Sequence, residues 1–416
     1  MRFLNFIKNL VLSLYSMTVL ALFLSVADQP LGRLGYLPLN PTVCALLLLV
    51  PFAAWSLFAH LLTKSNRYFI APLTSNLVPY SSFFLIVAFS LILSVLPGAF
   101  WAEGGKWIFL ICYGFGISLL ALFIPQSTIF PRLFPYCGLV ALVLLCWSIY
   151  LDIAYPGTFA ELGQRPAGFP GNANFAALVA VMLCASSLDY RPRHGLLRNI
   201  LALDATGAVM VTTMSRSGAL NFLFLVTIFA FIRMSESRWN PREVLKVATT
   251  TAIMLGVCVG LAVGAVLTGT ISEQTRLGRL MNNQQVDDGS AASRLFAVRE
   301  SLRLIDESPI LGHGTGHSRT MRELPHNLYL QQWVNNGVIG VCSLVGFFGV
   351  TLLTFIQRRY RPGQALILVA MLGGVFSHNV LDQRCFLLLL GILLGLSSYA
   401  RSPAIARYAS AARWAP

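Results

Sequence analysis

Long apolar runs follow one another along the chain, separated by shorter stretches in which charged residues, Pro and Gly gather. Each run is continuous rather than alternating with polar residues, and most approach the ~20 residues that a helix needs to cross a bilayer. This pattern predicts an all-α polytopic integral membrane protein with about 12 transmembrane helices. The predicted spans are 10–27, 42–62, 77–96, 107–124, 133–153, 172–188, 200–215, 217–232, 247–268, 338–356, 364–380 and 385–400.

The composition agrees with a membrane protein. Hydrophobic residues make up 56% of the 416 positions and charged residues only 11%, and the mean hydropathy is +0.69. Soluble domains carry about 25% charged residues, so these values exclude a soluble enzyme, a disordered chain and a secreted disulfide scaffold. The eight cysteines lie in or beside apolar runs without Cys-x-x-Cys spacing, which indicates small buried side chains rather than a zinc or redox site. No Ala-x-Ala site follows the first run, so we expect a retained span rather than a cleaved signal.

Positive charge is distributed unevenly between the two sides of the predicted spans. The chain has 30 Lys and Arg against 16 Asp and Glu, a formal net charge of +14. With a cytoplasmic N-terminus, 18 of these 30 basic residues fall in cytoplasmic segments and only five in short outside loops, as the positive-inside rule requires. Those five are Arg33, Lys106, Arg165, Arg216 and Arg384. The net charge is therefore a topology signal that puts both termini in the cytoplasm, and we expect no nucleic-acid partner.

One outside segment, residues 269–337, is much longer than the other connections, and long loops are usually functional or disordered. Apolar residues repeat at helical spacing across 291–307, Ser290 or Ser293 is available to cap the start, and Pro309 and Gly312 follow the end. The repeating residues are Leu295, Val298, Leu302 and Ile305. We therefore expect an ordered amphipathic helix on the membrane surface.

This loop divides the chain into three predicted parts. Residues 1–268 hold the first nine spans, and residues 269–337 form a periplasmic loop with amphipathic helices. Residues 338–416 hold the last three spans and a cytoplasmic tail.

His326 stands at the outer end of a partly polar helix that leads into the tenth predicted span. Pro325 suits the first turn of a helix on which Asn327 and Gln331 share one face. Imidazole is the side chain best suited to proton transfer near neutral pH, and a helix N-terminus disfavours its protonated form. His326 is therefore a candidate general base, and the alternative is an interfacial His without a catalytic task.

Arg216 lies in a tight turn between two apolar runs of about 16 residues each. Sixteen helical residues span about 24 Å, less than the roughly 30 Å hydrocarbon core, so the turn should lie below the outer membrane surface. An Arg at that depth is costly unless it faces water or an anion. Its planar fork matches phosphate oxygens, which predicts an anion clamp for a lipid phosphate; the alternative is a snorkelling side chain.

Other polar residues have weaker signals. Arg294 opens the amphipathic helix and is alternatively part of a solvated face, whereas Arg165 lies in a Gly- and Pro-rich loop that is alternatively a plain turn. His313 and His317 are separated by glycines and lack a neighbouring carboxylate cluster, so we expect no metal there. The glycines around them can instead allow close backbone approach to a phosphate.

Several of these motifs together resemble the signature of the bacterial O-antigen ligase and polymerase superfamily. The matching residues are Arg294, Ser308-Pro309, Gly312-x-Gly314-x-Gly316, Pro325-His326-Asn327-x-Tyr329-Leu330 and Gly337-x-x-Gly340. The Ser215-Arg216-Ser217-Gly218 turn and the stretch from Arg165 to Asn172-x-Asn174 resemble two further motifs of the family. The resemblance covers residues from about 163 to 340, and the number of predicted spans also fits.

The resemblance implies an inverting, metal-independent glycosyltransferase at the periplasmic face of the bacterial inner membrane. Such enzymes move O-antigen polysaccharide from undecaprenyl pyrophosphate to a sugar hydroxyl of lipid A–core in lipopolysaccharide biosynthesis. The implied partners are the lipid-linked O-antigen, lipid A–core and membrane lipids. No cofactor is expected, because the lipid-linked donor is already activated.

The resemblance and the side-chain chemistry together suggest roles for individual residues. His326 would accept the proton of the acceptor hydroxyl, and Arg216, Arg294 and Arg165 would bind the pyrophosphate. Supporting positions are Asn327, Asn174, Gly314 and Tyr329.

Two alternatives to a ligase stay open. An O-antigen polymerase of the same superfamily would tend to have two sizeable periplasmic loops with Arg-x10-Gly patterns, whereas the 154–170 loop here is short and the Arg303–Gly314 match is expected by chance. A lipid-linked sugar transporter or flippase often has internal repeats and broken helices at the midplane, and no such symmetry is visible. We therefore favour the ligase.

Overall fold

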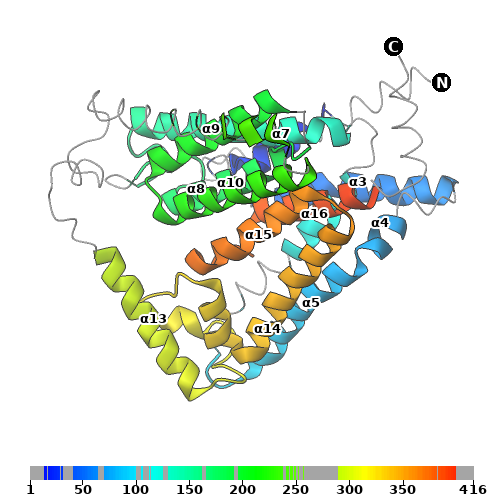
Figure 1. Cartoon of the computed structure of the whole chain (residues 1–416). Helices are drawn as coiled ribbons and strands as arrows, with labels where there is room; N and C mark the ends of the chain where they lie inside the picture. The colour runs from blue at the N-terminus through cyan, green and yellow to red at the C-terminus, as the bar shows by residue number, and fades with distance from the viewer. Residues whose placement is uncertain are drawn as a thin grey trace, which may run out of the picture. The chain divides into compact units, whose positions relative to one another are not determined.

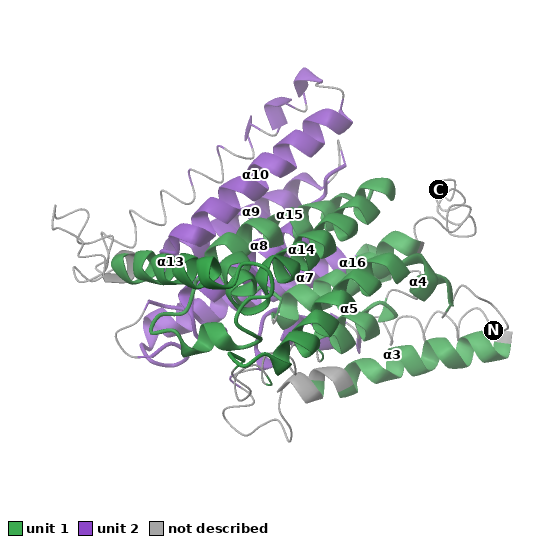
Figure 2. Cartoon of the chain, turned by 90° about the horizontal axis from the view of Figure 1, so that it is seen from below, with its two compact units in different colours: residues 1–13, 42–132, 290–416 green, residues 14–41, 133–289 purple. Residues whose placement is uncertain are grey.

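The computed structural model describes residues 14–28, 41–63, 70–99, 114–124, 130–161, 165–191, 195–237 and 289–399, with gaps at 16 and 382. It also describes isolated positions at 30, 105 and 112 and between 240 and 256. All regular secondary structure in these residues is helical (Figure 1), which confirms the all-α prediction. The chain divides into two compact units (Figure 2): unit 1 comprises residues 1–13, 42–132 and 290–416, and unit 2 comprises residues 14–41 and 133–289.

Unit 1 is built around the long helix α14. Its described helices are α3 (Pro41–Thr63), α4 (Ile70–Ser75), α5 (Leu77–Ile92), η1 (Leu93–Val95), α13 (Gly289–Glu307), η3 (His317–Thr320), α14 (Leu328–Gln357), α15 (Arg361–Phe376) and α16 (Arg384–Tyr399). Aromatic side chains join α14 to α5, and the stacked rings of Phe83 and Phe347 lie 5.0 Å apart. Gly363 allows α15 to start close to α14, because a side chain there would meet the Phe355 ring.

Unit 2 contains α7 (Phe130–Ala154), α8 (Ala173–Ser187), α9 (Leu196–Thr213) and α10 (Arg216–Glu236). α8 is its central helix, and nearly every side chain along it is buried, including Met182 and Leu183. Small residues permit close helix packing here. Gly138 of α7 faces Ser187 of α8, and Gly218 of α10 faces Ala177 of α8.

Within the part of the chain that the structure describes, four helical segments are long and apolar enough to cross a membrane: Leu77–Val95, Phe130–Ala154, Arg216–Glu236 and Leu328–Gln357. Within the described residues, helices coincide with predicted spans 42–62, 77–96, 133–153, 172–188, 200–215, 217–232, 338–356, 364–380 and 385–400. The predicted spans 10–27, 107–124 and 247–268 lie partly or largely outside the described residues. The chain is thus a helical membrane protein, and the total of 12 spans stays a prediction.

Polar contacts distinguish the two ends of unit 1. At one end, Arg358 Nη1 donates to Asn76 Oδ1 at 2.7 Å and to Ser397 Oγ at 2.7 Å, which joins the end of α14 to the start of α5 and the end of α16. At the other end, Thr315 donates to the carbonyl oxygen of Ser90 at 2.6 Å, near the end of α5. The 308–320 segment therefore lies at the opposite end of the unit from Arg358.

α13 confirms the amphipathic helix predicted over 291–307. Ser290 and Ser293 lie within it, so the prediction that either residue caps its start is wrong. Its buried face is formed by Ala297, Ser301, Leu304 and Ile305, and the last two pack with Met321 and Val334. The other predicted apolar residues, Leu295, Val298 and Leu302, are exposed.

Candidate functional site

His326 lies immediately before the residue that caps α14. Asn327 has an extended backbone, and its side-chain oxygen accepts hydrogen bonds from the backbone N–H groups of Tyr329 at 2.9 Å and Leu330 at 3.1 Å. This is N-cap geometry, which satisfies two donors that the first helical turn leaves unpaired. The expectation that Pro325 occupies the first turn is therefore wrong, because the Asn cap starts the helix at Leu328. The His326 side chain is exposed at this helix end.

The surroundings of His326 favour a neutral imidazole. Partial burial lowers its pKa below the ordinary value, and the positive charge of Arg294 lowers it further, whereas Glu323 acts in the opposite direction. A neutral imidazole can accept a proton, which is the state that a general base needs. Two of the predicted site residues, His326 and Arg294, thus lie in unit 1, where the charge of Arg294 acts on the imidazole.

A second imidazole, which the sequence analysis did not single out, lies beside His326. The ring of His378 is centred 5.5 Å from the ring of His326 and tilted by 51°. His378 lies two residues after the end of α15. This end of α15 is joined to the start of α14, because Tyr329 Oη donates to the carbonyl oxygen of Met371 at 2.9 Å. The signal available in the sequence was its place at the end of the predicted span 364–380, on the same predicted side of the membrane as His326.

The segment before His326 is held against a kink in α14. Gly337 has φ 63° and ψ −163°, and a side chain there would meet the backbone of Ile310. Around this kink Asn335 Oδ1 accepts from the Ser318 N–H at 2.7 Å, and Asn336 Oδ1 accepts from the Thr315 hydroxyl at 3.0 Å. These amides face the loop rather than lipid, which is why the first turns of α14 are polar.

Gly314 packs against the protein backbone. It has φ 102°, a conformation that residues with a side chain rarely adopt, and a Cβ atom would lie 2.8 Å from the backbone nitrogen of Ala99. Gly312 is similar, with the carbonyl oxygen of Asn335 2.6 Å from such a Cβ. These glycines are therefore explained by packing.

His313 and His317 also have structural partners. Their rings stack 4.7 Å apart, His313 Nε2 lies 2.8 Å from the carbonyl oxygen of Leu304, and His317 Nδ1 lies 2.8 Å from that of Gly98. One nitrogen of each ring is thus engaged with a backbone carbonyl, so the pair connects the loop to α13 and to the chain that follows η1. Among the described residues no group of three or more His, Cys, Asp or Glu side chains has metal-binding geometry.

In unit 2, the predicted residue Arg165 holds the turn that precedes Arg216. Its guanidinium group donates to the carbonyl oxygens of Thr213 at 3.3 Å and Met214 at 3.0 Å, and to Asn174 Oδ1 at 3.3 Å. Met214 has a left-handed φ of 47°, where the chain leaves α9. Arg165 therefore binds carbonyl oxygens that the end of α9 leaves without helical partners.

Asn174 and Ser215 complete this cluster, which we call the turn clamp (Arg165, Asn174, Met214 and Ser215). Ser215 donates to Asn174 Oδ1 at 2.9 Å and accepts from the Gly218 N–H at 3.1 Å, so it is also the N-cap of α10. Arg216 is the first residue of α10, and its side chain is exposed. The clamp thus fixes the direction in which Arg216 leaves the turn, at a helix N-terminus that attracts anions.

Asp152 positions the loop that carries Arg165, and the sequence analysis did not single it out. Its buried carboxylate accepts hydrogen bonds from the backbone N–H groups of Phe159, Ala160, Ala167 and Gly168, at 2.9 Å for Ala167. One side chain thus orders both arms of the loop. The described parts of the loop, residues 155–161 and 165–171, are thus anchored to the end of α7, which the Gly and Pro content alone did not reveal.

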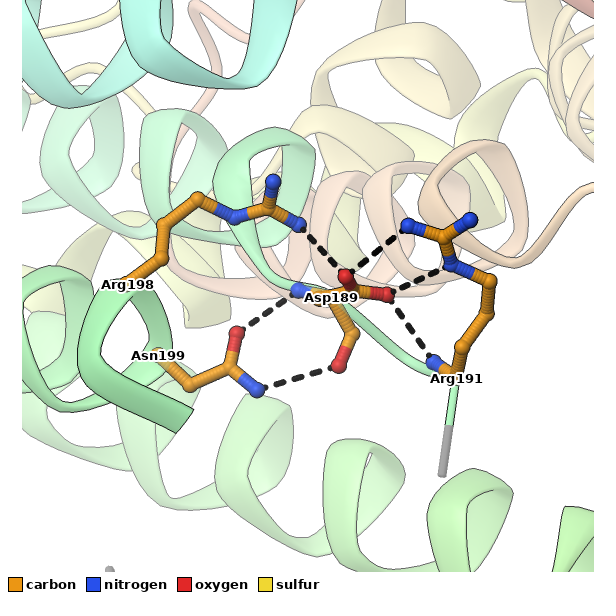
Figure 3. Close-up of polar contacts among 4 residues, drawn as sticks. All are labelled: Asp189, Arg191, Arg198 and Asn199. Atoms are coloured by element: carbon orange, nitrogen blue, oxygen red, sulfur yellow. Dashed lines mark hydrogen bonds and ion pairs between the residues drawn. The ribbon is translucent and has the colours of Figure 1, made fainter. Parts of the chain in front are cut away.

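The connection between α8 and α9 is fixed by a second buried carboxylate (Figure 3). The Asp189 carboxylate pairs with Arg191 Nε at 3.1 Å and with Arg198 Nη2 at 3.3 Å. The Asn199 side chain accepts from the backbone N–H of Asp189 and donates to its backbone carbonyl oxygen. Burial alone would raise the pKa of Asp189, but hydrogen bonds and charge from Arg191 and the charge of Arg198 lower it below the ordinary value. Two of the predicted cytoplasmic arginines therefore stabilise the fold.

The predicted site residues thus form two groups. Unit 1 contains His326, Arg294, Asn327, Tyr329 and Gly314, and unit 2 contains Arg165, Asn174 and Arg216.

Comparison with known proteins supplies a family for the central part of the chain. Residues 201–345 match a family model described as O-antigen ligase. The matched segment contains Arg216, Arg294 and His326 but neither Arg165 nor His378. No curated protein matches the chain. Members of this family are glycosyltransferase-like enzymes, ligases or polymerases. The match of residues 201–345 thus confirms the predicted resemblance to the O-antigen ligase and polymerase superfamily.

Proposed function

We propose that this protein is an O-antigen ligase, an inverting glycosyltransferase that moves O-antigen polysaccharide from undecaprenyl pyrophosphate to a sugar hydroxyl of lipid A–core. The observation that carries the proposal is the environment of His326. Its imidazole is exposed at the start of α14, the charge of Arg294 helps to keep it neutral, and it lies within the segment that matches the ligase family.

In the proposed reaction His326 accepts the proton of the acceptor hydroxyl. The acceptor oxygen attacks the anomeric carbon as the bond from that carbon to the pyrophosphate oxygen breaks, which inverts the anomeric configuration. The electron pair of this bond leaves with undecaprenyl pyrophosphate. General-base assistance of this kind contributes about 10²–10⁴ in rate.

Arg216 and Arg294 would stabilise the negative charge that develops on the pyrophosphate. Arg guanidinium groups bind phosphate oxygens bidentately, and fixed positive charge at a leaving group lowers the barrier. Arg165 donates hydrogen bonds to Thr213, Met214 and Asn174, so its proposed contribution to pyrophosphate binding includes holding Arg216 in place. The donor is already activated, and the proposal includes no metal or cofactor.

The proposed setting is the bacterial inner membrane, with 12 spans, both termini in the cytoplasm and residues 269–337 in the periplasm. Arg358 is predicted to be cytoplasmic and residues 308–320 to be periplasmic. The two lie at opposite ends of unit 1, which supports this topology. In a cysteine-free background, Glu307→Cys should react with a membrane-impermeant thiol reagent in intact spheroplasts, and Ser237→Cys should react only after lysis. The reverse pattern would reject the orientation.

Reconstitution tests the reaction. Purified wild-type protein, lipid-linked O-antigen and lipid A–core should yield polymer on the core in the presence of a chelator, and His326→Ala should lose activity by at least about 100-fold. His317→Ala is the matched control, because it removes an imidazole from the same unit without touching the proposed base. Longer lipid-linked polymer without core attachment would indicate a polymerase instead. Coupled movement of the donor across the bilayer without transfer would indicate a flippase.

A further inference from the structure

The contact between His326 and His378 is set by the packing of two helices. Tyr329, in the first turn of α14, is hydrogen-bonded to α15 through Met371, and its ring lies 3.3 Å from where a Cβ of Gly374 would be. This close approach brings the end of α15, and His378 after it, to the start of α14. Their separation is therefore determined by the helix packing and not by a free loop.

His378 has unused hydrogen-bonding capacity. Its Nδ1 atom is buried without a hydrogen-bond partner, and so is Oδ1 of the adjacent Asn379. Buried polar atoms in folded proteins are nearly always paired, so two neighbouring unpaired atoms require an explanation. By contrast, His313 and His317 each direct a ring nitrogen at a backbone carbonyl oxygen. A polar ligand at His378 would supply the missing partner.

The spacing of the two rings suits a hydroxyl group. Each imidazole nitrogen lies about 1.2 Å from its ring centre and bonds an oxygen at about 2.6–3.2 Å. Rings centred 5.5 Å apart can therefore both reach one hydroxyl, or two adjacent hydroxyls of a sugar. The rings are tilted rather than stacked, which leaves ring edges available for such contacts.

We propose, on the basis of the function proposed above, that His378 is a substrate-binding residue of the same site and that its imidazole hydrogen-bonds a hydroxyl of the acceptor sugar. The division of roles is that His326 takes the proton and His378 orients the hydroxyl that loses it.

The charge environment suits this division. Burial, the charge of Arg319 and the proximity of His326 lower the pKa of His378 to about 4. His378 therefore stays neutral while the neighbouring base takes up a proton, and a neutral imidazole has one donor and one acceptor for sugar hydroxyls. A second imidazole that also became charged would oppose proton uptake by His326.

The test measures the two substrates separately with full-length protein in detergent. For His378→Ala we expect the KM for lipid A–core to rise about tenfold, with the KM for lipid-linked O-antigen unchanged. His378→Gln keeps an amide donor and acceptor and should give an intermediate KM. His317→Ala is the control that should leave the acceptor KM unchanged. Gel filtration and thermal unfolding establish that each variant is folded.

The outcomes separate this inference from the function on which it rests. Transfer by the wild type together with an unchanged acceptor KM in folded His378→Ala overturns the inference alone. Absence of transfer by the wild type overturns the proposed function. In that case, direct binding of lipid A–core to His326→Ala and to the His326→Ala, His378→Ala double variant decides the inference, and equal affinity of the two rejects it.

Discussion

Arg165 donates a hydrogen bond of 3.0 Å to the backbone carbonyl oxygen of Met214, the residue with φ 47° at which the chain leaves α9. The two residues are 49 positions apart in the chain. The bond therefore ties the loop ordered by Asp152 to the turn that presents Arg216, and it gives Arg165 a structural task beside the predicted binding of phosphate.

Loss of this clamp should weaken both the fold and the reaction. A hydrogen bond from a charged group contributes about 1.5–3 kcal/mol, so Arg165→Ala should lower the thermal unfolding temperature in detergent and the rate of transfer. Arg165→Lys should not restore either, because an ammonium group cannot reproduce the planar fork that reaches two carbonyls and Asn174. Arg242→Ala, at an exposed position of the same unit, is the control. Wild-type stability in Arg165→Lys would contradict the clamp.

The pH profile of transfer should respond in opposite directions to two charge changes near His326. The base works in its neutral form, so kcat/KM should fall as pH drops through its pKa, which lies below the ordinary value. Arg294→Gln removes a positive charge, so the pKa should rise and the acidic limb should move to higher pH. Glu323→Gln removes a negative charge and should move the same limb to lower pH.

The pH profile distinguishes a change in the pKa of the base from a nonspecific loss of activity. Arg294→Gln should also lower the maximal rate if this side chain binds pyrophosphate. A loss of rate by itself does not change the pH at which the acidic limb of the profile falls, so a shifted limb reports the change in pKa. Equal limbs in the wild type and both variants would show that His326 is not the titrating base.

The Asn327 cap makes a further prediction. Asn327→Ala removes the acceptor for the Tyr329 and Leu330 N–H groups and should cost about 0.5–2 kcal/mol, measured as a lower unfolding temperature. Asn327→Asp keeps the cap but adds a negative charge beside His326, so it should preserve stability and raise the pKa of the base. Asn172→Ala, at the cap of α8, is a matched control that should lower stability without moving the pH profile.

Gly314 should be intolerant of any side chain. Its φ of 102° and the 2.8 Å approach to Ala99 predict that Gly314→Ala reduces the amount of folded protein in the membrane. Gly346→Ala is the matched control, since no atom lies within 4 Å of a Cβ placed there. Equal yields and equal unfolding temperatures for both variants would contradict the packing role of Gly314.

The sequence determined the features that depend on local pattern. Continuous apolar runs predicted the helices, since a helix in a bilayer satisfies its own backbone hydrogen bonds. Among the described helices, four are long and apolar enough to span. The spacing of apolar residues predicted α13, and the motif around His326 predicted the family that residues 201–345 match. Each of these signals is contained in neighbouring residues.

Only the tertiary structure decided which residues meet. The pairing of His326 with His378 depends on helix packing between α14 and α15, and the bond from Arg165 to Met214 depends on how α9 ends. The buried face of α13 also depends on its partners, because Leu304 and Ile305 pack with Met321 and Val334 from a distant segment. Contacts between distant segments depend on the shapes of both partners, and no local pattern contains both.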